Sequence, residues 1–242
     1  KVLVVAEKAE AEYLDLLSVL GVEALIGNEA IEFVTPVELF KPDLVITSPG
    51  FRPDSKAILW AKSQGLEIWT DIDLAWRLRD KVGRPADWIC VTGTNGKTTT
   101  VQLATHILQQ AGLRAEACGN IGVPILDCIR NEDGFDVLVV ELSSFQLHYL
   151  GEIKPFASAV LNIDLDHIDW HGSLAEYQKA KGKVYENVEA ACVFNENDSV
   201  TIRLVENSDV QEGARAIGFT TGFPGPSNIG FTDGLLVDNA FS

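Results

Sequence analysis

The sequence predicts an α/β protein with mostly parallel strands and a small antiparallel element toward its C-terminal end. Two observations predict this class. Short apolar runs alternate with amphipathic stretches along most of the chain, which is the order typical of strand–helix–strand units. A composition of 46% hydrophobic and 22% charged residues over 242 residues supplies enough apolar side chains for a packed core.

The first part of the chain shows this alternation clearly. The expected strands are residues 2–5, 44–47 and 66–69, and the expected helices are residues 11–20 and 55–64. Each of these helices is followed by a glycine, Gly21 or Gly65, the residue that commonly ends a helix. Residues 80–87 are charged and contain Gly and Pro, as linkers do. We therefore predict two domains, at residues 1–84 and 85–242.

The second part begins with a strand at residues 88–91 and a helix at residues 98–111, whose apolar residues recur at helical spacing. The further elements expected are strands at 136–140, 157–163 and 191–194 and a helix at 174–187. Beyond Asp209 the alternation weakens. Residues 230–237 have the pattern of a hairpin that turns at Asp233 and Gly234.

Charge and composition exclude several classes of partner. The 19 Lys and Arg residues against 35 Asp and Glu residues give a net charge of −16, which repels nucleic acids and anionic membranes. An anionic ligand therefore needs a local binding device. The four cysteines form no C-x-x-C pair, and no apolar run approaches the ~20 residues of a membrane span, so we expect a cytoplasmic protein. The absence of Met leads us to expect a fragment of a longer chain.

The strongest local motif is Gly93-Thr94-Asn95-Gly96-Lys97-Thr98-Thr99, between a predicted strand and a predicted helix. Glycines there let backbone N–H groups approach phosphates, and the helix N-terminus adds positive potential. Lys97 can reach the β and γ phosphates, and the Thr98 hydroxyl can bind Mg²⁺. Val91 occupies the position of the usual first glycine, so an ordinary turn before a helix is the alternative.

Acidic residues follow the next two predicted strands. Glu141 ends the apolar run 137–140, where a carboxylate would face the phosphate loop and suit Mg²⁺; the alternative is a role in capping the next helix with Ser143 or Ser144. The loop after the strand at 157–163 holds Asp164, Asp166, His167, Asp169 and His171. This set suggests a cation site or, equally, a polar loop; zinc is disfavoured because no thiolate joins it.

Two further segments carry candidate residues. Gly119-Asn120-Ile121-Gly122 could offer an amide side chain to a ligand, although Gly-Asn is also a common turn pair. Lys179, Lys181 and Lys183 lie on one predicted helix, usually a solvated surface. Near Mg²⁺ an ammonium is repelled, so a lysine serves there only if it is modified to an anion or touches phosphate.

In their order along the chain, these motifs resemble the Mur ligase family of ATP-dependent enzymes that form amide bonds. They are residues 93–99, 119–122, 141–146 and 162–167. Within the family, residues 141–146 and 177–187 most resemble the member that adds D-glutamate. The likeness runs from about Val2 to Asp198.

The resemblance implies a truncated Rossmann-like N-terminal domain that binds the UDP end of the substrate. A P-loop NTPase-like central domain with its end missing would follow, and the C-terminal domain that presents the amino acid would be absent. We therefore expect these residues to be inactive alone. The implied substrates are ATP, UDP-N-acetylmuramoyl-L-alanine and D-glutamate, in peptidoglycan synthesis and hence cell-wall biogenesis, cell division and cell shape.

The resemblance also implies which residues bind the nucleotide and its metal. Lys97 would polarise the γ phosphate of ATP, while Thr98 and Glu141 hold a first Mg²⁺. The full set of implied ATP contacts is Gly93, Thr94, Asn95, Gly96, Lys97, Thr98, Thr99 and Thr100.

Further implied roles concern a second Mg²⁺ and the substrate. His167 would hold the second Mg²⁺, together with Lys181, which matches the lysine that is carbamylated in the family. Glu7 is a candidate for the uridine. The implied substrate contacts are Ser48, Gly50, Asn120, Gln146 and His167.

Two other functions stay open at this point. The chain could be a nucleotide- and substrate-binding module without turnover, because the domain that supplies the amine is expected to be absent. It could also come from another member of the family, such as the diaminopimelate-adding or folate-linked ligase, although residues 141–146 argue against this.

Overall fold

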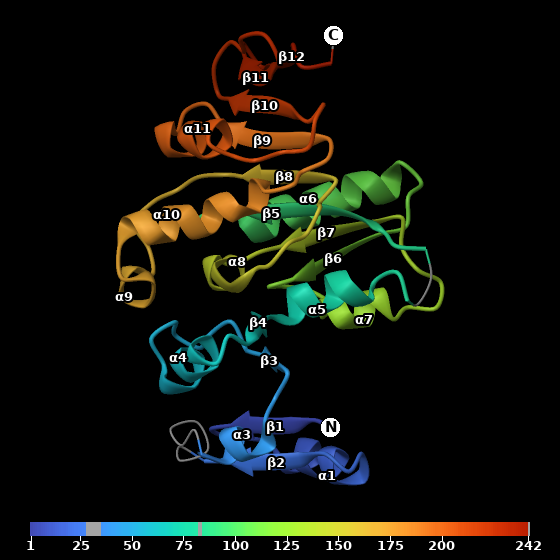
Figure 1. Cartoon of the computed structure of the whole chain (residues 1–242). Coiled ribbons are helices and arrows are strands. Elements are labelled where there is room, and N and C mark those ends of the chain that lie inside the picture. The colour runs from blue at the N-terminus through green and yellow to red at the C-terminus, as the bar shows by residue number, and fades with distance from the viewer. Residues whose placement is uncertain (28–34, 82–83, 242) are drawn as a thin grey trace. The chain divides into compact units, whose positions relative to one another are not determined.

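A computed structural model describes residues 1–27, 35–81 and 84–241 of the chain. The chain divides into two compact units, Lys1–Trp69 and Thr70–Ser242 (Figure 1). Val82 and Gly83, in the predicted linker at 80–87, lie outside the described residues. In the described part, no helix combines the length and apolar character needed to cross a membrane.

The first unit contains two small parallel sheets, β1–β2 and β3–β4. Its elements are β1 (Leu3–Ala6), α1 (Ala11–Val19), β2 (Glu23–Ile26), α3 (Thr35–Phe40), β3 (Leu44–Ile46), α4 (Lys56–Ser63) and β4 (Glu67–Trp69). The three strands and two helices predicted from the alternation are confirmed within a residue or two at their ends. The sequence did not predict β2 and α3, because segments of 4 and 6 residues are too short to show a clear period.

The second unit is built on one eight-stranded sheet in the order β12-β11-β10-β9-β8-β5-β7-β6. Its strands are β5 (Asp87–Thr92), β6 (Ala115–Gly119), β7 (Val137–Glu141), β8 (Ala157–Val160), β9 (Ala191–Asn195), β10 (Arg215–Thr220), β11 (Asn228–Thr232) and β12 (Leu235–Asp238). Every pair is parallel except β11 and β12, which are antiparallel. The predicted parallel sheet and C-terminal hairpin are both confirmed.

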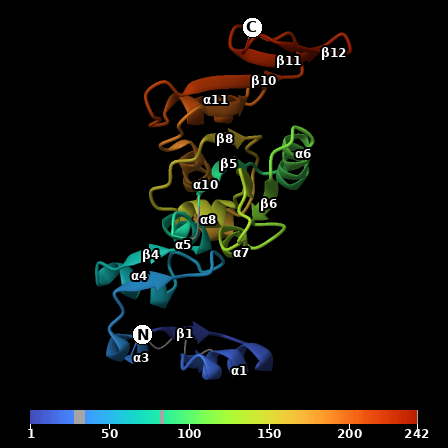
Figure 2. The ribbon, with the colours of Figure 1, turned by 90° about the vertical axis from the view of Figure 1, so that its right-hand side faces the viewer.

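Helices cover both faces of the large sheet (Figure 2). They are α5 (Asp71–Leu78), α6 (Lys97–Gln110), α7 (Ile125–Ile129), α8 (Ser144–Tyr149), α9 (Ile168–His171), α10 (Leu174–Gly182), the 3-10 helix η1 (Lys183–Tyr185) and α11 (Ser199–Glu206). Alternate residues of β7 divide between the faces: Val139 packs in a cluster with Val101 of α6, whereas Leu138 packs with Leu147 of α8. This two-sided burial explains the continuous apolar run of β7.

Two predicted elements are shorter than expected because tertiary contacts end them. The helix predicted to continue to residue 187 stops at Gly182 and becomes η1. Tyr185 turns into the core there, and its hydroxyl donates to the Val193 carbonyl at 2.6 Å. Strand β8 ends at Val160, before the predicted residue 163, because Asn162 leaves the sheet to bind the loop after β5 through its carbonyl and side chain.

The compact units divide between Trp69 and Thr70, earlier than the boundary at residues 84 and 85 that the composition indicates. Helix α5 accounts for the difference. Ile72 of α5 is fully buried in the same core cluster as Trp88, and the Asp73 carboxylate accepts a hydrogen bond from Gly151 N at 2.6 Å. The assignment of the two units to uridine binding and ATP binding stays a prediction.

Replacing Gly119 with alanine is expected to destabilise the second unit strongly. Gly119 has a φ of +95°, and an added Cβ would overlap the Glu141 carbonyl oxygen. Strain and overlap together should lower the free energy of unfolding by roughly 2–5 kcal/mol. Gly134→Ala is the matched control, because Gly134 has a φ of +64° with open space around its Cβ position; it should cost about 1 kcal/mol. Equal losses in urea unfolding would contradict this reading of Gly119.

Candidate functional site

The candidate residues gather where three neighbouring parallel strands end. Strand β5 lies between β7 and β8, with Val91 opposite Glu141 and Thr92 opposite Val160. The carboxyl ends of parallel strands share one edge of a sheet, where ligands of open α/β folds bind. The loops after β5, β7 and β8 therefore meet at this edge, as the sequence predicts.

The loop 93–96 joins β5 to the 14-residue helix α6. Gly96 is the N-cap residue of α6 with a φ of +81°, and no side chain caps the helix. At Gly93, with a φ of +153°, an added Cβ would lie 3.1 Å from Leu161 Cβ, so the close approach of the two loops favours glycine. The uncapped N–H groups and the helix dipole make this a ready anion site.

Thr100 departs from the nucleotide contacts that the resemblance implies. It lies one turn inside α6, where its backbone N–H donates to the Gly96 carbonyl at 3.0 Å and its Oγ1 donates to the same oxygen at 2.9 Å. Only the first N–H groups of a helix lack a partner within it, and Thr100 falls beyond them. Both of its donors are therefore engaged in the helix, and the geometry does not support a phosphate contact from Thr100. The N–H groups of Thr94 and Asn95 already donate to Asn162, so the free donors lie at the start of α6, at residues 96–99.

The Lys97 side chain folds back onto this loop. Its ammonium donates to the carbonyl oxygens of Gly93 at 2.9 Å and Thr94 at 3.0 Å. The positive charge is thus held beside the loop rather than extended into solvent. This is the position in which a lysine can neutralise a phosphate that the loop binds.

Thr98, Asn120 and Glu141 form the second part of the site. Glu141 is 2% exposed, and its carboxylate accepts from Thr98 Oγ1 at 2.9 Å and from Asn120 Nδ2 at 3.0 Å. Ser143, not Glu141, caps helix α8 by accepting from Gln146 N. The capping alternative for Glu141 is therefore not what the structure shows, and the carboxylate stands beside the phosphate loop.

The loop after β8 is tied to the phosphate loop by hydrogen bonds. Asn162 Oδ1 accepts from Asn95 N at 2.8 Å, and Asn162 Nδ2 donates to Asn95 O at 3.0 Å. Asp164 N donates to Thr94 Oγ1 at 2.9 Å. This loop carries His167, which has a φ of +51° and a ring centroid 4.7 Å from that of Phe145.

The other acidic and histidine residues of this loop have local roles. The Asp164 and Asp166 carboxylates accept from the backbone N–H of the residue that follows each, and Asp166 Oδ2 lies 3.3 Å from His167 Nε2. His171 is buried, with its Nε2 3.0 Å from Ser144 Oγ, and burial lowers its pKa to about 4. Among the described residues, no group of three or more His, Cys, Asp or Glu side chains is arranged to hold a metal ion.

Lys181 reaches the phosphate loop from helix α10. Its side chain is 2% exposed, and its Nζ donates to Gly93 O at 2.9 Å and Thr92 Oγ1 at 3.2 Å. Burial, and then the nearby charge of Lys97, lower the pKa of Lys181 to about 7. Lys179 is exposed and Lys183 donates to the carbonyl oxygens of His148 and Leu150, so only Lys181 of the three joins the phosphate loop.

Sequence reasoning did not assign a role to Tyr177. Its hydroxyl lies 2.8 Å from Thr94 Oγ1, and its ring centroid is 5.1 Å from Lys181 Nζ. The available signal was its spacing, since residues four apart share one face of a helix. Asn162 belongs to the motif at residues 162–167, but its residue type does not indicate that it binds the loop after β5.

The predicted substrate residues occupy different environments. Asn120 is exposed and close to Glu141, whereas Gln146 is 3% exposed and its Oε1 accepts from Ser143 N at 3.0 Å. Ser48 starts a turn in the first unit, where its carbonyl accepts from Phe51 N. Gly50 and Glu7 also belong to the first unit, and the part of these three residues in a substrate site stays a prediction.

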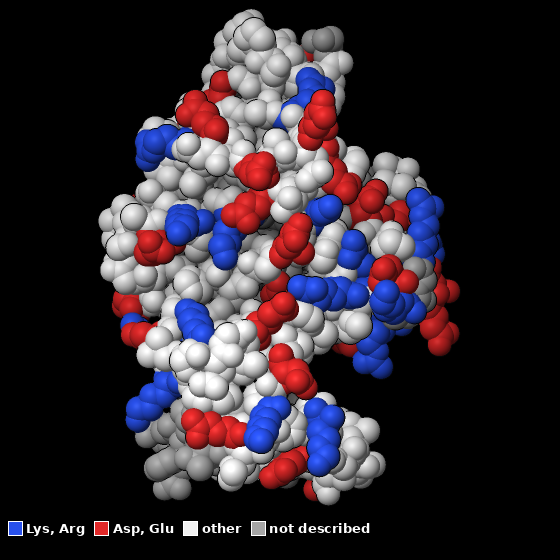
Figure 3. All heavy atoms as spheres, viewed as in Figure 1, with Lys and Arg blue, Asp and Glu red and all other residues white. Residues whose placement is uncertain are grey.

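The surface charge gives no broad attraction for an anion. Acidic and basic side chains are interspersed over the face viewed in Figure 3, in a chain of net charge −16. A phosphate ligand therefore depends on local groups, namely the loop N–H groups, the N-terminus of α6 and Lys97.

Comparison with known proteins agrees with this geometry. The family model of the Mur ligase middle domain matches residues 91–222, which is more than half of the chain. The chain belongs to the Mur ligase family, and the resemblance found in the sequence is confirmed.

One curated relative and two solved structures define the likeness further. The chain is 54% identical to the UDP-N-acetylmuramoylalanine--D-glutamate ligase of Leifsonia xyli subsp. xyli, over 99% of this chain and 48% of that protein. It therefore spans about half the length of that relative. Its fold matches the UDP-N-acetylmuramate:L-alanyl-gamma-D-glutamyl-meso-diaminopimelate ligase from Neisseria meningitides, with a TM-score of 0.55 and 16% identity over 99% of this chain and 77% of that chain. It also matches a MurF ligase from Thermotoga maritima in complex with ADP, with a TM-score of 0.51 and 18% identity over 90% and 47% of the two chains.

The buried amine of Lys181 should make stability depend on pH. Its pKa falls from 10.5 to about 7 on folding, so the unfolded chain binds more protons between these values. The free energy of unfolding should therefore rise with pH from about 7 to about 10.5, by roughly 2–5 kcal/mol. In CO₂-depleted buffer, Lys181→Met should remove this rise, as measured by urea unfolding at several pH values. A difference between the two proteins that stays constant with pH would contradict a neutral buried amine.

Proposed function

We propose that this chain is part of an ATP-dependent ligase that adds D-glutamate to UDP-N-acetylmuramoyl-L-alanine in peptidoglycan synthesis. The observation that carries the proposal is the meeting of Lys97, Glu141 and Lys181 around the loop that follows β5. The 54% identity to the D-glutamate ligase of Leifsonia xyli supports this specificity. A cytoplasmic location and a contribution to cell-wall biogenesis, cell division and cell shape belong to the same proposal.

The residues after β5 fit the triphosphate of ATP. In the proposed complex, the N–H groups of residues 96–99 donate to phosphate oxygens, and Lys97 moves from the loop carbonyls onto the γ phosphate. A lysine in this place stabilises charge as the phosphoryl group is transferred. The carboxylate of UDP-N-acetylmuramoyl-L-alanine then attacks the γ phosphorus and ADP leaves.

Thr98 and Glu141 have the donor types that Mg²⁺ requires. The hydroxyl and carboxylate oxygens lie 2.9 Å apart beside the phosphate loop, and hard oxygen ligands are those that Mg²⁺ prefers. These two residues would hold the first Mg²⁺, which when bound neutralises phosphate charge. Asn120 orients the carboxylate by donating to its other oxygen.

A second Mg²⁺ would be held by His167 and by a modified Lys181. An ammonium does not fit a cation site, because like charges repel. The neutral amine favoured by a pKa of about 7 can attack CO₂, forming a carbamate and releasing a proton. The ammonium (+1) first loses one proton to give the neutral amine, and the reaction with CO₂ then gives a carbamate of charge −1. The carbamate supplies oxygen donors where the chain otherwise offers an amine.

Amide formation completes the proposed reaction. The D-glutamate amine attacks the acyl carbon of the acyl phosphate, inorganic phosphate leaves, and the nitrogen loses a proton. In the second unit, Asn120, Gln146 and His167 are the residues we propose for the muramoyl and phosphate groups of the substrate. For the first unit by itself, we propose Ser48 and Gly50 as substrate contacts.

A second candidate function is a binding module without turnover. The observation that favours it is the alignment, which covers 48% of the length of the Leifsonia xyli relative. Calorimetry on this chain with Mg·ATP and with UDP-N-acetylmuramoyl-L-alanine would show binding without product. Product formation by the 242-residue chain would exclude this candidate.

Lys97→Ala should abolish phosphoryl transfer. Loss of a charge that stabilises the transition state typically costs about 10²–10³ in rate. The assay is phosphate release that requires ATP, UDP-N-acetylmuramoyl-L-alanine and D-glutamate, made with this chain and with the longest natural protein that contains it. Lys179→Ala, which removes an exposed lysine, should leave the rate within about twofold. If neither protein showed such release, the proposed ligase would be refuted; release from the longer protein alone would fit the expected inactivity of this chain.

Lys181→Ala should be partly rescued by short carboxylic acids. If a carbamate is required, acetate or formate can replace its oxygens once the side chain has been removed. We expect phosphate release to recover at least about tenfold from the variant's basal rate at saturating acid. Lys97→Ala should show no recovery, because an anion cannot replace its positive charge. Complete loss of activity in Lys181→Ala without rescue would count against carbamylation.

A further inference from the structure

A second polar pocket lies at the opposite edge of the large sheet from the phosphate loop. Residues just before or near the starts of β5, β6 and β7 line it, including Trp88, Arg114 and Leu138. The loops after β5 and β7, which carry Lys97 and Glu141, leave the sheet from the other ends of these strands. The pocket therefore belongs to neither the nucleotide site nor the proposed reaction.

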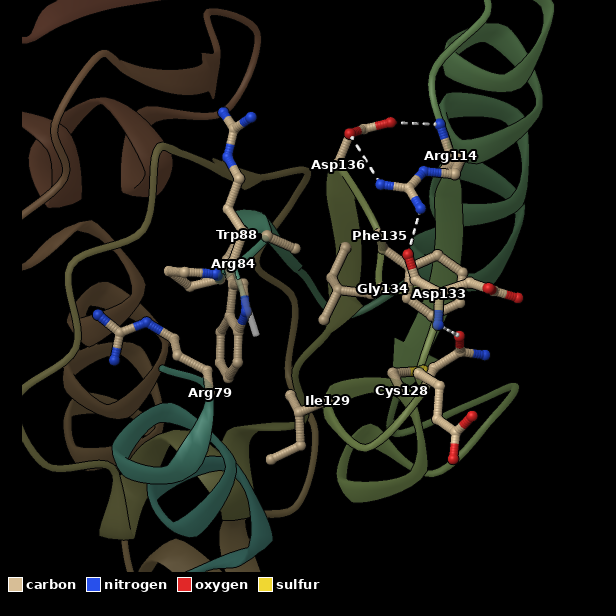
Figure 4. A pocket seen from close by; sticks show the side chains of 15 residues that line it. Arg79, Arg84, Trp88, Arg114, Cys128, Ile129, Asp133, Gly134, Phe135 and Asp136 are labelled. Atoms are coloured by element: carbon tan, nitrogen blue, oxygen red, sulfur yellow. Dashed lines mark hydrogen bonds and ion pairs between the residues drawn. The ribbon is translucent and has the colours of Figure 1, made fainter. Parts of the chain in front are cut away.

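Three polar side chains on one wall of this pocket are hydrogen-bond donors only. Figure 4 shows Arg79, Arg84 and Trp88 together on one side. Trp88 is 1% exposed, and within the described residues its indole Nε1 has no hydrogen-bond partner. An indole N–H and a guanidinium can donate but not accept. The partner that this wall lacks must therefore carry acceptor atoms.

Contacts with Trp76 fix the geometry of this wall. The Arg79 guanidinium carbon lies 3.3 Å from the ring centroid of Trp76, and Trp76 packs edge-on against Trp88 with centroids 5.0 Å apart. One N–H of Arg79 donates to the Trp76 carbonyl oxygen. Burial lowers the pKa of Arg79 below its usual value, yet a guanidinium stays charged at neutral pH. Arg84 is exposed, and its side chain has no ion-pair or hydrogen-bond partner among the described residues.

Of the acidic residues across the pocket, Asp136 contacts Arg114 directly and acts on Arg84 through its charge without a direct contact. Asp136 accepts from Arg114 N at 2.9 Å and faces the Arg114 guanidinium at 3.4 Å. These contacts, backbone first, hold the pKa of Asp136 below its usual range. Arg114 also donates to the Asp133 carbonyl oxygen, and in Figure 4 the Asp133 side chain points away from Trp88. The charges of Asp80 and Glu189 likewise act on Arg79. Within the described residues no hydrogen bond uses the donors of Arg84 or the Trp88 indole N–H, so these donors remain for a ligand, together with the N–H groups of Arg79 that do not bind Trp76.

We propose that this pocket binds a small oxyanion, a phosphate or carboxylate group held by Arg84, Arg79 and the Trp88 indole N–H. The pocket has a volume of about 130 Å³, equivalent to about four water molecules, which suits such a group. Charge-assisted hydrogen bonds from guanidinium groups are the strong, directional contacts that recognise oxyanions. The chain has a net charge of −16 and does not attract anions as a whole. The donors of Arg84, Arg79 and Trp88 supply a local attraction for an oxyanion.

The test is an NMR titration of the indole N–H signals of the ¹⁵N-labelled chain at constant ionic strength. Trp88→Phe, supported by through-bond assignment of the native chain, identifies the Trp88 signal. Inorganic phosphate and succinate are titrated separately, and the one that saturates at lower concentration identifies the preferred class. We expect the Trp88 signal to move and saturate with at least one of the two.

Charge-matched variants separate this pocket from other anion sites. Arg84→Ala should weaken the response of Trp88 about tenfold in Kd, whereas Arg203→Ala, which removes an exposed arginine of α11, should leave it within twofold. Lys97→Ala should leave it unchanged, because phosphate bound at the nucleotide loop lies at the other edge. No saturable movement of the Trp88 signal with either anion, or equal effects of Arg84→Ala and Arg203→Ala, would overturn the proposal. Because turnover is not measured, this result is independent of the ligase assay.

Discussion

The carbonyl oxygen of Gly93 accepts hydrogen bonds from two lysine ammonium groups, Lys97 and Lys181, each at 2.9 Å. Two ammonium groups that contact the same buried oxygen repel each other. A nearby negative charge, or the loss of a proton from one of the amines, reduces this repulsion. Burial, and then the nearby charge of Lys97, lower the pKa of Lys181 to about 7. This one arrangement explains why the loop favours an anion and why Lys181 is suited to chemical modification.

The sheet makes this arrangement possible. Because β5 pairs in parallel with both β7 and β8, the ends of all three strands lie at one edge and their loops come within hydrogen-bonding distance. Glycine permits the closest approaches: Gly93 lies against Leu161, and Gly119 lies against Glu141. The clamp between Asn95 and Asn162 then links the phosphate loop to the segment that carries His167.

Sequence reasoning predicted the parts of this structure that have a strong local signal. The phosphate loop, the strand that ends at Glu141 and the hairpin at Asp233 and Gly234 all combine a clear period with a characteristic turn. Short helices such as α7 and α8, of 5 and 6 residues, escaped because they complete too few turns to show a period. The charged stretch at residues 80–87 does not predict the boundary between the units, which lies before α5. That boundary depends on the packing of Ile72 in the core of the second unit and on the hydrogen bond that Asp73 accepts from Gly151.

Lys181 is the clearest example of a residue whose environment the sequence does not predict. Helical spacing separates Lys181 from Lys179 and Lys183, but it does not say which side faces a loop far away in the chain. That information comes from the packing of α10 beside β5, which buries Lys181 and leaves Lys179 exposed. The same packing places the Tyr177 hydroxyl beside Thr94. This contact cannot be predicted from the types of the two residues.

The central claim is that the loops after β5, β7 and β8 form a single nucleotide-phosphate site. A crystal structure of the chain with a non-hydrolysable ATP analogue and Mn²⁺, whose anomalous scattering locates the metal, tests it most directly. The account predicts the terminal phosphate at the N–H groups of residues 96–98 with Lys97 against it, and Mn²⁺ bound by Thr98 and Glu141. A nucleotide bound elsewhere, or metal density away from Glu141, would contradict it.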